Sequence, residues 1–312
     1  MNEVKFSVFS DLHYWPGNFS TDGMACLDKI RDRALENHVD FVIHLGDLCH
    51  APSKYPEIVG YYDGIPLQTY HCIGNHECEW STYDEVLEAY RMEKGYYCFD
   101  RNGFRFLVLD LNNMRIDGQV VHYSMGNYRK PIEGMQLVTF PEEQLAWLEQ
   151  TIMESPYPCI LFSHHSLERA NGGLPPAERR AVRELLRRVN RDKQRVLMAV
   201  NGHYHRDNLR IMDNIAFFDL NSTSCEWVSP QHFGKYPEEF YNQYRFAHNT
   251  VIWEDPIHAI ITVREDGTIK IEGMKSRFLY GVDHYSIGLA PEDSDGRPCV
   301  AEVLSAQFRL IP

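Results

Sequence analysis

Short apolar runs that each lead into a cluster of Asp, His or Asn residues constrain the fold of this chain more than any other feature. The runs cover residues 4–9, 41–45, 69–73, 159–162 and 196–200, and each has the length of a buried strand. The clusters after them are Asp11-Leu12-His13, Gly46-Asp47-Leu48, Gly74-Asn75-His76-Glu77, His164-His165 and Gly202-His203-Tyr204-His205. Because ligands bind at the carboxyl ends of strands in open α/β sheets, we expect the five strand ends to converge on one crevice.

The side chains in these clusters are types that bind divalent cations. Seven candidate ligands are too many for one ion, since a zinc site takes about four, so two ions are expected. Asp47 is the best candidate for a bridge, because a carboxylate can join two cations and an imidazole cannot. We expect the first ion to be completed by Asp11, His13 and His205, and the second by Asn75, His164 and His203. Mixed imidazole, carboxylate and amide ligands suit iron, manganese or zinc, and the identity of the metal stays open.

The order of the clusters is D-x-H, GD, GNH[DE], a later His and GHxH, and it resembles the calcineurin-like metallophosphoesterase superfamily. Each piece alone is a weak signal, but five ordered pieces between Asp11 and His205 are specific. The resemblance implies an α/β fold in which two mixed β-sheets form a layered sandwich flanked by helices. It also implies a dinuclear metal centre, hydrolysis of phosphate esters, and contact of His76 with the phosphate instead of a metal ion.

The implied chemistry is attack of a metal-bound hydroxide on phosphorus. Two cations about 3.5–4 Å apart polarise phosphoryl oxygens and ionise a water near neutral pH. His76 is the candidate catalytic acid at the leaving oxygen. Glu77 is one candidate to orient His76, and another carboxylate is the alternative. His165 either lies beside the ligands or faces away, because successive strand residues point to opposite faces of a sheet.

Purely structural explanations compete with this interpretation. Gly-Asp after an apolar run is most often a turn, and buried His residues are usually just hydrogen-bonded. Neither explains why Asp, His and Asn gather at five separate strand ends. A non-catalytic metal-binding scaffold with this fold would be expected to have lost ligands, and here none is missing.

The residues after Asp47 bear on the substrate. Protein Ser/Thr phosphatases of the superfamily read GDxVDRG, whereas this chain has Leu48, Cys49 and His50 after its Gly-Asp and no Arg follows. This departure favours hydrolysis of a small-molecule phosphodiester. A phosphomonoesterase or a nucleotide pyrophosphatase on the same dinuclear centre is the alternative.

Four further residues are candidates for substrate binding. His50 lies close to Asp47 in sequence, although a solvated loop histidine is the favoured interpretation. Residues 112–139 form a longer connection than usual, so they are a candidate substrate cap that brings Tyr128 or Arg129 to the ligand, with a surface hairpin as the alternative. Arg206 follows His205 and either holds a substrate phosphate or lies on an exposed loop.

Two aromatic segments are candidates for the walls of the site. The loop 14–22 contains Tyr14, Trp15 and Phe19, and it either lines the mouth of the site or covers the edge of the domain. The segment 226–253 contains eight aromatic rings of Trp, Phe and Tyr. It is interpreted as a second wall of the pocket or as the contact of a homo-oligomer, with coverage of the core as the alternative.

Composition restricts the partners and the compartment. The formal net charge of −13 argues against a nucleic-acid surface, which needs clustered Lys and Arg. The eight cysteines show no C-x-x-C spacing and are expected to be buried free thiols. With no recognisable signal peptide and no apolar run near the roughly 20 residues of a membrane span, no membrane partner and a cytoplasmic location are expected.

The chain is expected to form a single domain over residues 1–312. Its motif-bearing core covers residues 1–225, and residues 226–312 add the aromatic segment and outer-sheet strands. Strands are predicted at 259–263 and 268–271, joined by a hairpin turn at Glu265-Asp266-Gly267, and at 300–311.

Overall fold

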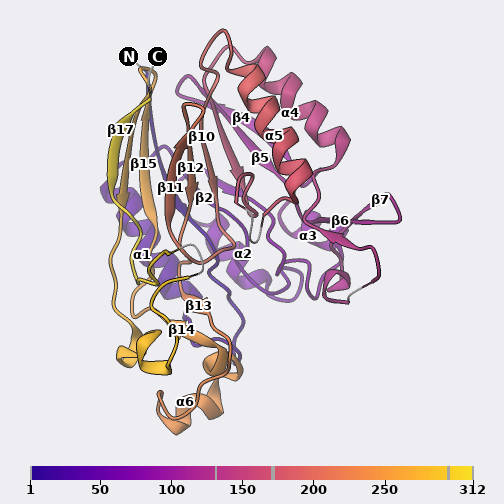
Figure 1. Cartoon of the computed structure of the whole chain (residues 1–312). Helices are drawn as coiled ribbons and strands as arrows, with labels where there is room; N and C mark the ends of the chain where they lie inside the picture. The colour runs from indigo at the N-terminus through magenta and orange to yellow at the C-terminus, as the bar shows by residue number, and fades with distance from the viewer. Residues whose placement is uncertain (1, 131, 170–172, 294–295, 311–312) are drawn as a thin grey trace.

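The computed structural model of the chain describes residues 2–130, 132–169, 173–293 and 296–310. Within these ranges two six-stranded sheets pack against each other through an apolar core. Helices cover the outer faces, and Figure 1 shows α4 (Glu142–Glu154) and α5 (Pro176–Val189) side by side beyond one of the sheets. The prediction of two mixed β-sheets flanked by helices is confirmed.

The first sheet has the strand order β17-β16-β15-β1-β2-β3. Its strands span Glu3–Phe9 (β1), Phe41–His44 (β2), Thr69–His71 (β3), Ala259–Arg264 (β15), Thr268–Gly273 (β16) and Ala306–Arg309 (β17). β1, β2 and β3 run parallel. β15 pairs antiparallel with β1, and the C-terminal strands therefore complete the sheet that the first strand begins.

The second sheet has the strand order β11-β12-β10-β9-β5-β4. Its strands span Tyr97–Arg101 (β4), Phe104–Leu109 (β5), Cys159–Ser163 (β9), Val196–Asn201 (β10), Asn208–Met212 (β11) and Ile215–Asp219 (β12). The four central strands run parallel, and β4 and β11 are antiparallel edges. Smaller sheets are formed by Asn113–Ile116 (β6), Gln119–His122 (β7) and Gln136–Leu137 (β8), and by Cys225–Trp227 (β13) and Thr250–Ile252 (β14).

The helices span Gly23–Glu36 (α1), Pro56–Asp63 (α2), Tyr83–Ala89 (α3), Glu142–Glu154 (α4), Pro176–Val189 (α5) and Glu238–Gln243 (α6). Single 3-10 turns lie at Asn127–Arg129 (η1), Arg245–Asn249 (η2), Leu279–Gly281 (η3) and Tyr285–Ile287 (η4). α1 begins after Asp22, whose carboxylate accepts a hydrogen bond from the N–H of Ala25. Its buried residues include Leu27, Ile30 and Ala34, the apolar positions that recur at helical spacing.

Aromatic rings fill the core between the two sheets. Phe6 of the first sheet stacks on Phe41, with ring centroids 5.1 Å apart. It also meets Phe106 and Phe162 of the second sheet edge to face, at centroid distances of 5.7 and 5.5 Å. All four rings are fully buried, so their burial holds the sheets against each other.

Three segments differ from the sequence-based expectation. The strand expected over 300–311 is only β17, because the residues before it make isolated contacts, and Ile311 lies outside the described residues. The strand expected over 69–73 ends at His71. The long connection 112–139 holds β6, β7, η1 and β8. All four residues of β7 are exposed, so β6 and β7 form the surface hairpin that was the alternative to a substrate cap.

All eight cysteines are free thiols. Six are buried, whereas Cys26 is half-buried and Cys98 is exposed.

Among the described residues, no helix has the length and apolar character needed to cross a membrane.

Candidate metal centre

The seven predicted ligands meet at the carboxyl ends of parallel strands from both sheets. In the first sheet, Asp11 and His13 follow β1, Asp47 follows β2 and Asn75 follows β3. In the second sheet, His164 follows β9, and His203 and His205 follow β10. All of them are buried except His203, which is partly exposed. The convergence expected from the sequence is therefore present.

Asp11, His13 and His205 form the first group of possible ligands. The Nε2 atom of His205 lies 3.1 Å from Asp11 Oδ1 and 3.1 Å from His13 Nε2. These three side chains are buried, and together they could hold a metal ion. The grouping is the one expected for the first ion.

Asn75, His164 and His203 form the second group. His164 Nε2 lies 3.1 Å from Asn75 Oδ1 and 3.1 Å from His203 Nδ1. It also lies 3.3 Å from Asp47 Oδ2, and ligand atoms of Asp11, Asp47 and His164 are all within 4.8 Å of one another. Asp47 thus lies between the two groups, where a bridging carboxylate is expected.

The hydrogen bonds at Nδ1 of His205 and His164 show which ring atom is free to bind a cation. His205 Nδ1 donates to the carbonyl oxygen of Cys225 at 2.6 Å, so the lone pair of the neutral ring is on Nε2 and faces the Asp11 carboxylate. His164 Nδ1 likewise donates to the Leu45 carbonyl oxygen at 2.8 Å, which turns the Nε2 lone pair toward Asp47. When the rings are neutral, acceptor faces acceptor in this buried site, and either a bound cation or a proton on Nε2 stabilises the contact. These residues therefore fit a metal ion.

The pKa values of these groups reflect the same need for positive charge. Burial alone would lower the pKa of His164, but the Asp47 carboxylate outweighs it and raises that pKa to about 9. Burial alone would raise the pKa of Asp47, but the charge of His164 holds it well below the usual range. Burial, aided by the charge of His164, lowers the pKa of His203 to about 3. The site thus favours anionic carboxylates and at least one cation.

Backbone conformation at the strand ends is unusual. Positive φ values, between 53° and 69°, occur at five of the predicted ligands: Asp11, His13, Asp47, His203 and His205. Each such residue costs about 1–3 kcal/mol, and such strain concentrates at functional sites. Glycine is needed nearby, because a Cβ on Gly74 would collide with Asp47 Oδ1 and one on Gly202 would collide with Ser10 Oγ. The glycine in each Gly-Asp, Gly-Asn and Gly-His motif therefore leaves room for atoms that a side chain would displace.

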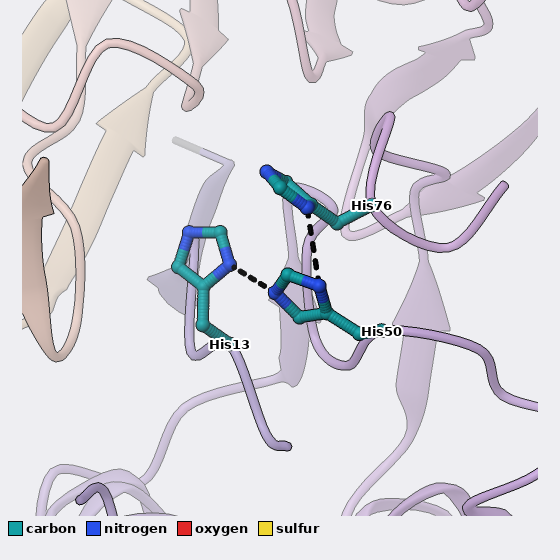
Figure 2. Close-up of side chains that lie close together, drawn as sticks. All are labelled: His13, His50 and His76. Atoms are coloured by element: carbon teal, nitrogen blue, oxygen red, sulfur yellow. Dashed lines mark hydrogen bonds between the residues drawn. The ribbon is translucent and has the colours of Figure 1, made fainter. Parts of the chain in front are cut away.

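His76 is held beside the metal groups by Glu79. Its Nδ1 lies 2.6 Å from Glu79 Oε2, and its Nε2 lies 3.9 Å from Asp47 Oδ2. Figure 2 shows His50 between His13 and His76, with the rings of all three close together. His50 lies 3.1 Å from His13 Nδ1 and 3.2 Å from His76 Nδ1, and it also contacts Glu79 at 3.1 Å. Glu79 therefore holds both His76 and His50.

Two expectations about these residues need correction. The sequence favours a solvated His50, but its side chain is only 1% exposed, because the Trp15 ring stacks on it with centroids 4.5 Å apart. Glu77 was a candidate to orient His76, but its carboxylate accepts hydrogen bonds from the backbone N–H groups of Asp47, Leu48 and Gly74. The alternative carboxylate, Glu79, contacts His76 instead. Its position three residues after His76 is the sequence signal that could have identified it.

The remaining substrate-binding candidates have different environments. The hydroxyl of Tyr128 donates to the Asn75 carbonyl oxygen at 3.1 Å, so η1 brings this residue to the site. Arg129 is half-exposed and pairs with Glu79 Oε1 at 2.5 Å. Arg206 is 9% exposed and pairs with Glu226 and Asp293, which rules out the exposed-loop alternative. Both arginines are thus engaged with carboxylates of the protein.

Both aromatic segments reach the candidate centre. Phe19 stacks on His13, with centroids 5.4 Å apart. Trp227 lies parallel to His76 at 6.1 Å and edge-on to His13 at 5.9 Å. The loop 14–22 and the segment 226–253 therefore form walls of the site, and they also pack on each other through Phe19 and Trp227.

Two cavities adjoin the candidate centre. The first, here called the polar pocket, encloses about 290 Å³ and is lined by His205, Tyr204, Arg206, Glu226, Trp227 and Asp293. The second, the tyrosine pocket, encloses about 360 Å³ and is lined by Asn75, Tyr123, Tyr128, Leu137, Val138 and His165. His203 lines both, so the two pockets meet at the second group of ligands. A larger cavity of about 440 Å³, between the start of α1 and Tyr280, is lined by none of the predicted site residues.

Comparisons with known proteins agree with this geometry. The family model for calcineurin-like phosphoesterases matches residues 4–207. The structure of a dimetal phosphatase from Danio rerio superimposes with a TM-score of 0.62 at 16% identity, covering 89% of this chain and 99% of that chain. The structure of GAP50, the anchor in the inner membrane complex of Plasmodium, superimposes with a TM-score of 0.55 at 10% identity. The match covers 100% of this chain and 90% of that chain. At these identities the structural likeness shows the fold alone. No curated protein matches the sequence closely enough to count as a relative.

The contacts of Glu79 predict a pH-dependent contribution to stability. Burial alone would raise the pKa of Glu79 above its ordinary 4.5, but hydrogen bonds from His50 and His76 lower it to about 2. The folded state therefore binds this proton less readily than the unfolded state, and the stabilisation is full above about pH 4.5 and is lost as the pH falls toward 2. We expect Glu79→Gln to lower the melting temperature by about 2–4 °C at pH 7.

Calorimetric melting of both proteins between pH 7 and pH 3 measures this effect. The difference between wild type and Glu79→Gln should narrow below pH 4.5. The exposed Glu143 provides a matched control, since Glu143→Gln should leave the melting curve unchanged. A difference that stays constant or widens toward low pH would contradict the assigned contacts.

Proposed function

The chain belongs to the calcineurin-like phosphoesterase family, and we propose that it is a metal-dependent hydrolase of small-molecule phosphodiesters. Membership of this family makes it a phosphoric ester hydrolase. The metal dependence is supported by two buried groups of possible ligands, in which His205 and His164 direct Nε2 at the carboxylates of Asp11 and Asp47. Each group offers the mixed imidazole and oxygen ligands that suit iron, manganese or zinc.

The proposed ligands divide as the two groups do. Asp11, His13 and His205 would hold one ion, Asn75, His164 and His203 would hold the other, and Asp47 would contact both. When bound, two cations polarise phosphoryl oxygens and lower the pKa of a water that attacks phosphorus. The protein contributes the fixed orientation of the ligand rings through the carbonyl oxygens of Cys225 and Leu45.

His76 is the proposed acid at the leaving oxygen. Glu79 engages its Nδ1 and so leaves Nε2, the atom near Asp47, available to the substrate. A proton at Nε2 can be donated to the leaving oxygen as negative charge develops there in the transition state. Trp227 and His50 pack around the ring and restrict its orientation. Glu79 acts here as a positioning residue.

The two pockets support a diester over a monoester substrate. A monoester carries one organic group, whereas a diester carries two, and the polar and tyrosine pockets meet at His203. Their linings differ, because ionic and polar side chains predominate in the polar pocket and Tyr, Leu and Val in the tyrosine pocket. A substrate with one group in each pocket would place its phosphorus beside the ligand groups.

Removing the central carboxylate should abolish the reaction. We expect purified, metal-loaded Asp47→Ala and His205→Ala to lose hydrolysis of bis(p-nitrophenyl) phosphate by a factor of at least about 10³, because the ions lose a ligand and their charge balance. Metal analysis should show less than the wild-type metal content in both variants. Asp255→Ala, at an exposed ion pair with Lys29, is the matched control and should retain both properties. Full activity in either site variant would refute the ligand assignment.

The proposed acid can be tested by varying the leaving group. We expect His76→Ala to keep its metal content but to hydrolyse methyl phenyl phosphate about 10²–10⁴ times more slowly, the range typical of a lost general acid. The loss should be smallest for methyl p-nitrophenyl phosphate, whose leaving group needs no proton. A series of substituted methyl aryl phosphates therefore gives a steeper dependence on leaving-group pKa in the variant. If the loss were equal across the series, His76 would not be the acid.

A further inference from the structure

The tyrosine pocket has a lining that the hydrolytic reaction itself does not require. Asn75 and His203, two of the proposed metal ligands, are among its lining residues. The remaining walls are aromatic and apolar, with Tyr123, Tyr128 and Val138 among them. A pocket of this kind binds one organic group of a substrate and fixes its orientation through a few polar atoms.

The two tyrosines form a stacked pair. Their ring centroids are 4.4 Å apart, with an angle of 23° between the planes. Both hydroxyl groups are engaged by the backbone, since Tyr128 donates to the Asn75 carbonyl oxygen and Tyr123 accepts from the Val138 N–H at 3.1 Å. The tyrosines therefore offer the pocket mainly their rings. Aromatic walls of this kind favour a planar ring as the occupant.

His165 is the polar group of this pocket. Its side chain is 2% exposed and lines the cavity, and within the described ranges its Nδ1 has no hydrogen-bond partner. Its ring lies edge-on to Tyr123 and 4.3 Å from the ring of His203. A buried imidazole nitrogen without a partner costs about 1–3 kcal/mol. A substrate atom that reached Nδ1 itself and formed a hydrogen bond with it would remove this cost.

We propose that the tyrosine pocket is the subsite for a planar ring that bears a hydrogen-bonding heteroatom, and that His165 selects this ring. The inference rests on the proposed phosphodiesterase function, because it assigns one of the two ester groups of the substrate. Heteroaromatic rings such as those of nucleosides have this chemistry. His165 is a specificity residue in this assignment, distinct from the ligands His164 and His203.

A competing role for His165 is metal binding. Ligand atoms of His164, His165 and His203 lie within 4.8 Å of one another, so this set could also hold an ion. The two roles predict different results for His165→Leu. Loss of a metal ligand lowers the metal content, whereas loss of a substrate contact leaves it unchanged.

Phosphonates test the subsite without any turnover, because their carbon–phosphorus bond is not an ester. The probes are methylphosphonate, benzylphosphonate and the isomeric pyridylmethylphosphonates, titrated calorimetrically into manganese-loaded full-length protein. We expect benzylphosphonate to bind about tenfold more tightly than methylphosphonate, and at least one pyridyl isomer to bind about fivefold to tenfold more tightly again. His165→Leu should remove the second increment and retain both the first increment and the metal content.

Two further variants make the result specific. His258 is fully buried, and in the described part of the chain both of its ring nitrogens lack partners, so His258→Leu is a matched control that should keep all the affinities. Leu137 is 40% exposed at the pocket, and Leu137→Trp should remove the preference for benzylphosphonate by narrowing the cavity.

Three results would overturn the assignment. They are equal binding of benzylphosphonate and methylphosphonate, a pyridyl increment that survives in His165→Leu, and loss of metal from that variant. A separate assay tests the proposed function itself, which fails if the wild-type protein does not hydrolyse phosphodiesters. In that case the binding ratios still decide whether the subsite exists.

Discussion

Buried hydrogen-bond acceptors that face one another are the constraint on which this structure depends. His164 Nε2 is directed at Asp47 and His205 Nε2 at Asp11, and in each ring the carbonyl oxygen behind Nδ1 fixes that direction. With neutral rings, such an arrangement is unfavourable in a buried site unless a cation or a shared proton lies between the acceptors. The fold sustains it by packing two sheets so that their strand ends meet, with strained backbone at five ligand positions.

The sequence predicted the convergence of these side chains because the information for it is local. Each motif follows its own strand directly, and the carboxyl ends of parallel strands meet wherever the sheets pack, so no long-range contact had to be known. The layered fold followed from the resemblance to a family. Strand lengths were less predictable. The residues before β17 form only isolated β-bridges, and their apolar composition does not distinguish such bridges from a continuous strand. The position of Phe6 among three other rings is a packing result that no local pattern contains.

Contacts between distant segments explain what the sequence did not predict. His50 is buried because Trp15 covers it, and Glu79 reaches it from another loop. The two pockets arise in the same way, since the tyrosine pocket combines residues from 75 to 203 and the polar pocket draws Glu226 and Asp293 from the C-terminal third. The proposed metal ligands are therefore encoded in short motifs, whereas the two pockets are built from segments that meet only in the folded chain.

Anomalous diffraction from crystals of the manganese-loaded protein tests the central claim most directly. The structure predicts two peaks about 3.5–4 Å apart. One should lie against Asp11, His13 and His205, the other against Asn75, His164 and His203, with Asp47 contacting both. A single ion, or two ions that do not share Asp47, would contradict the account.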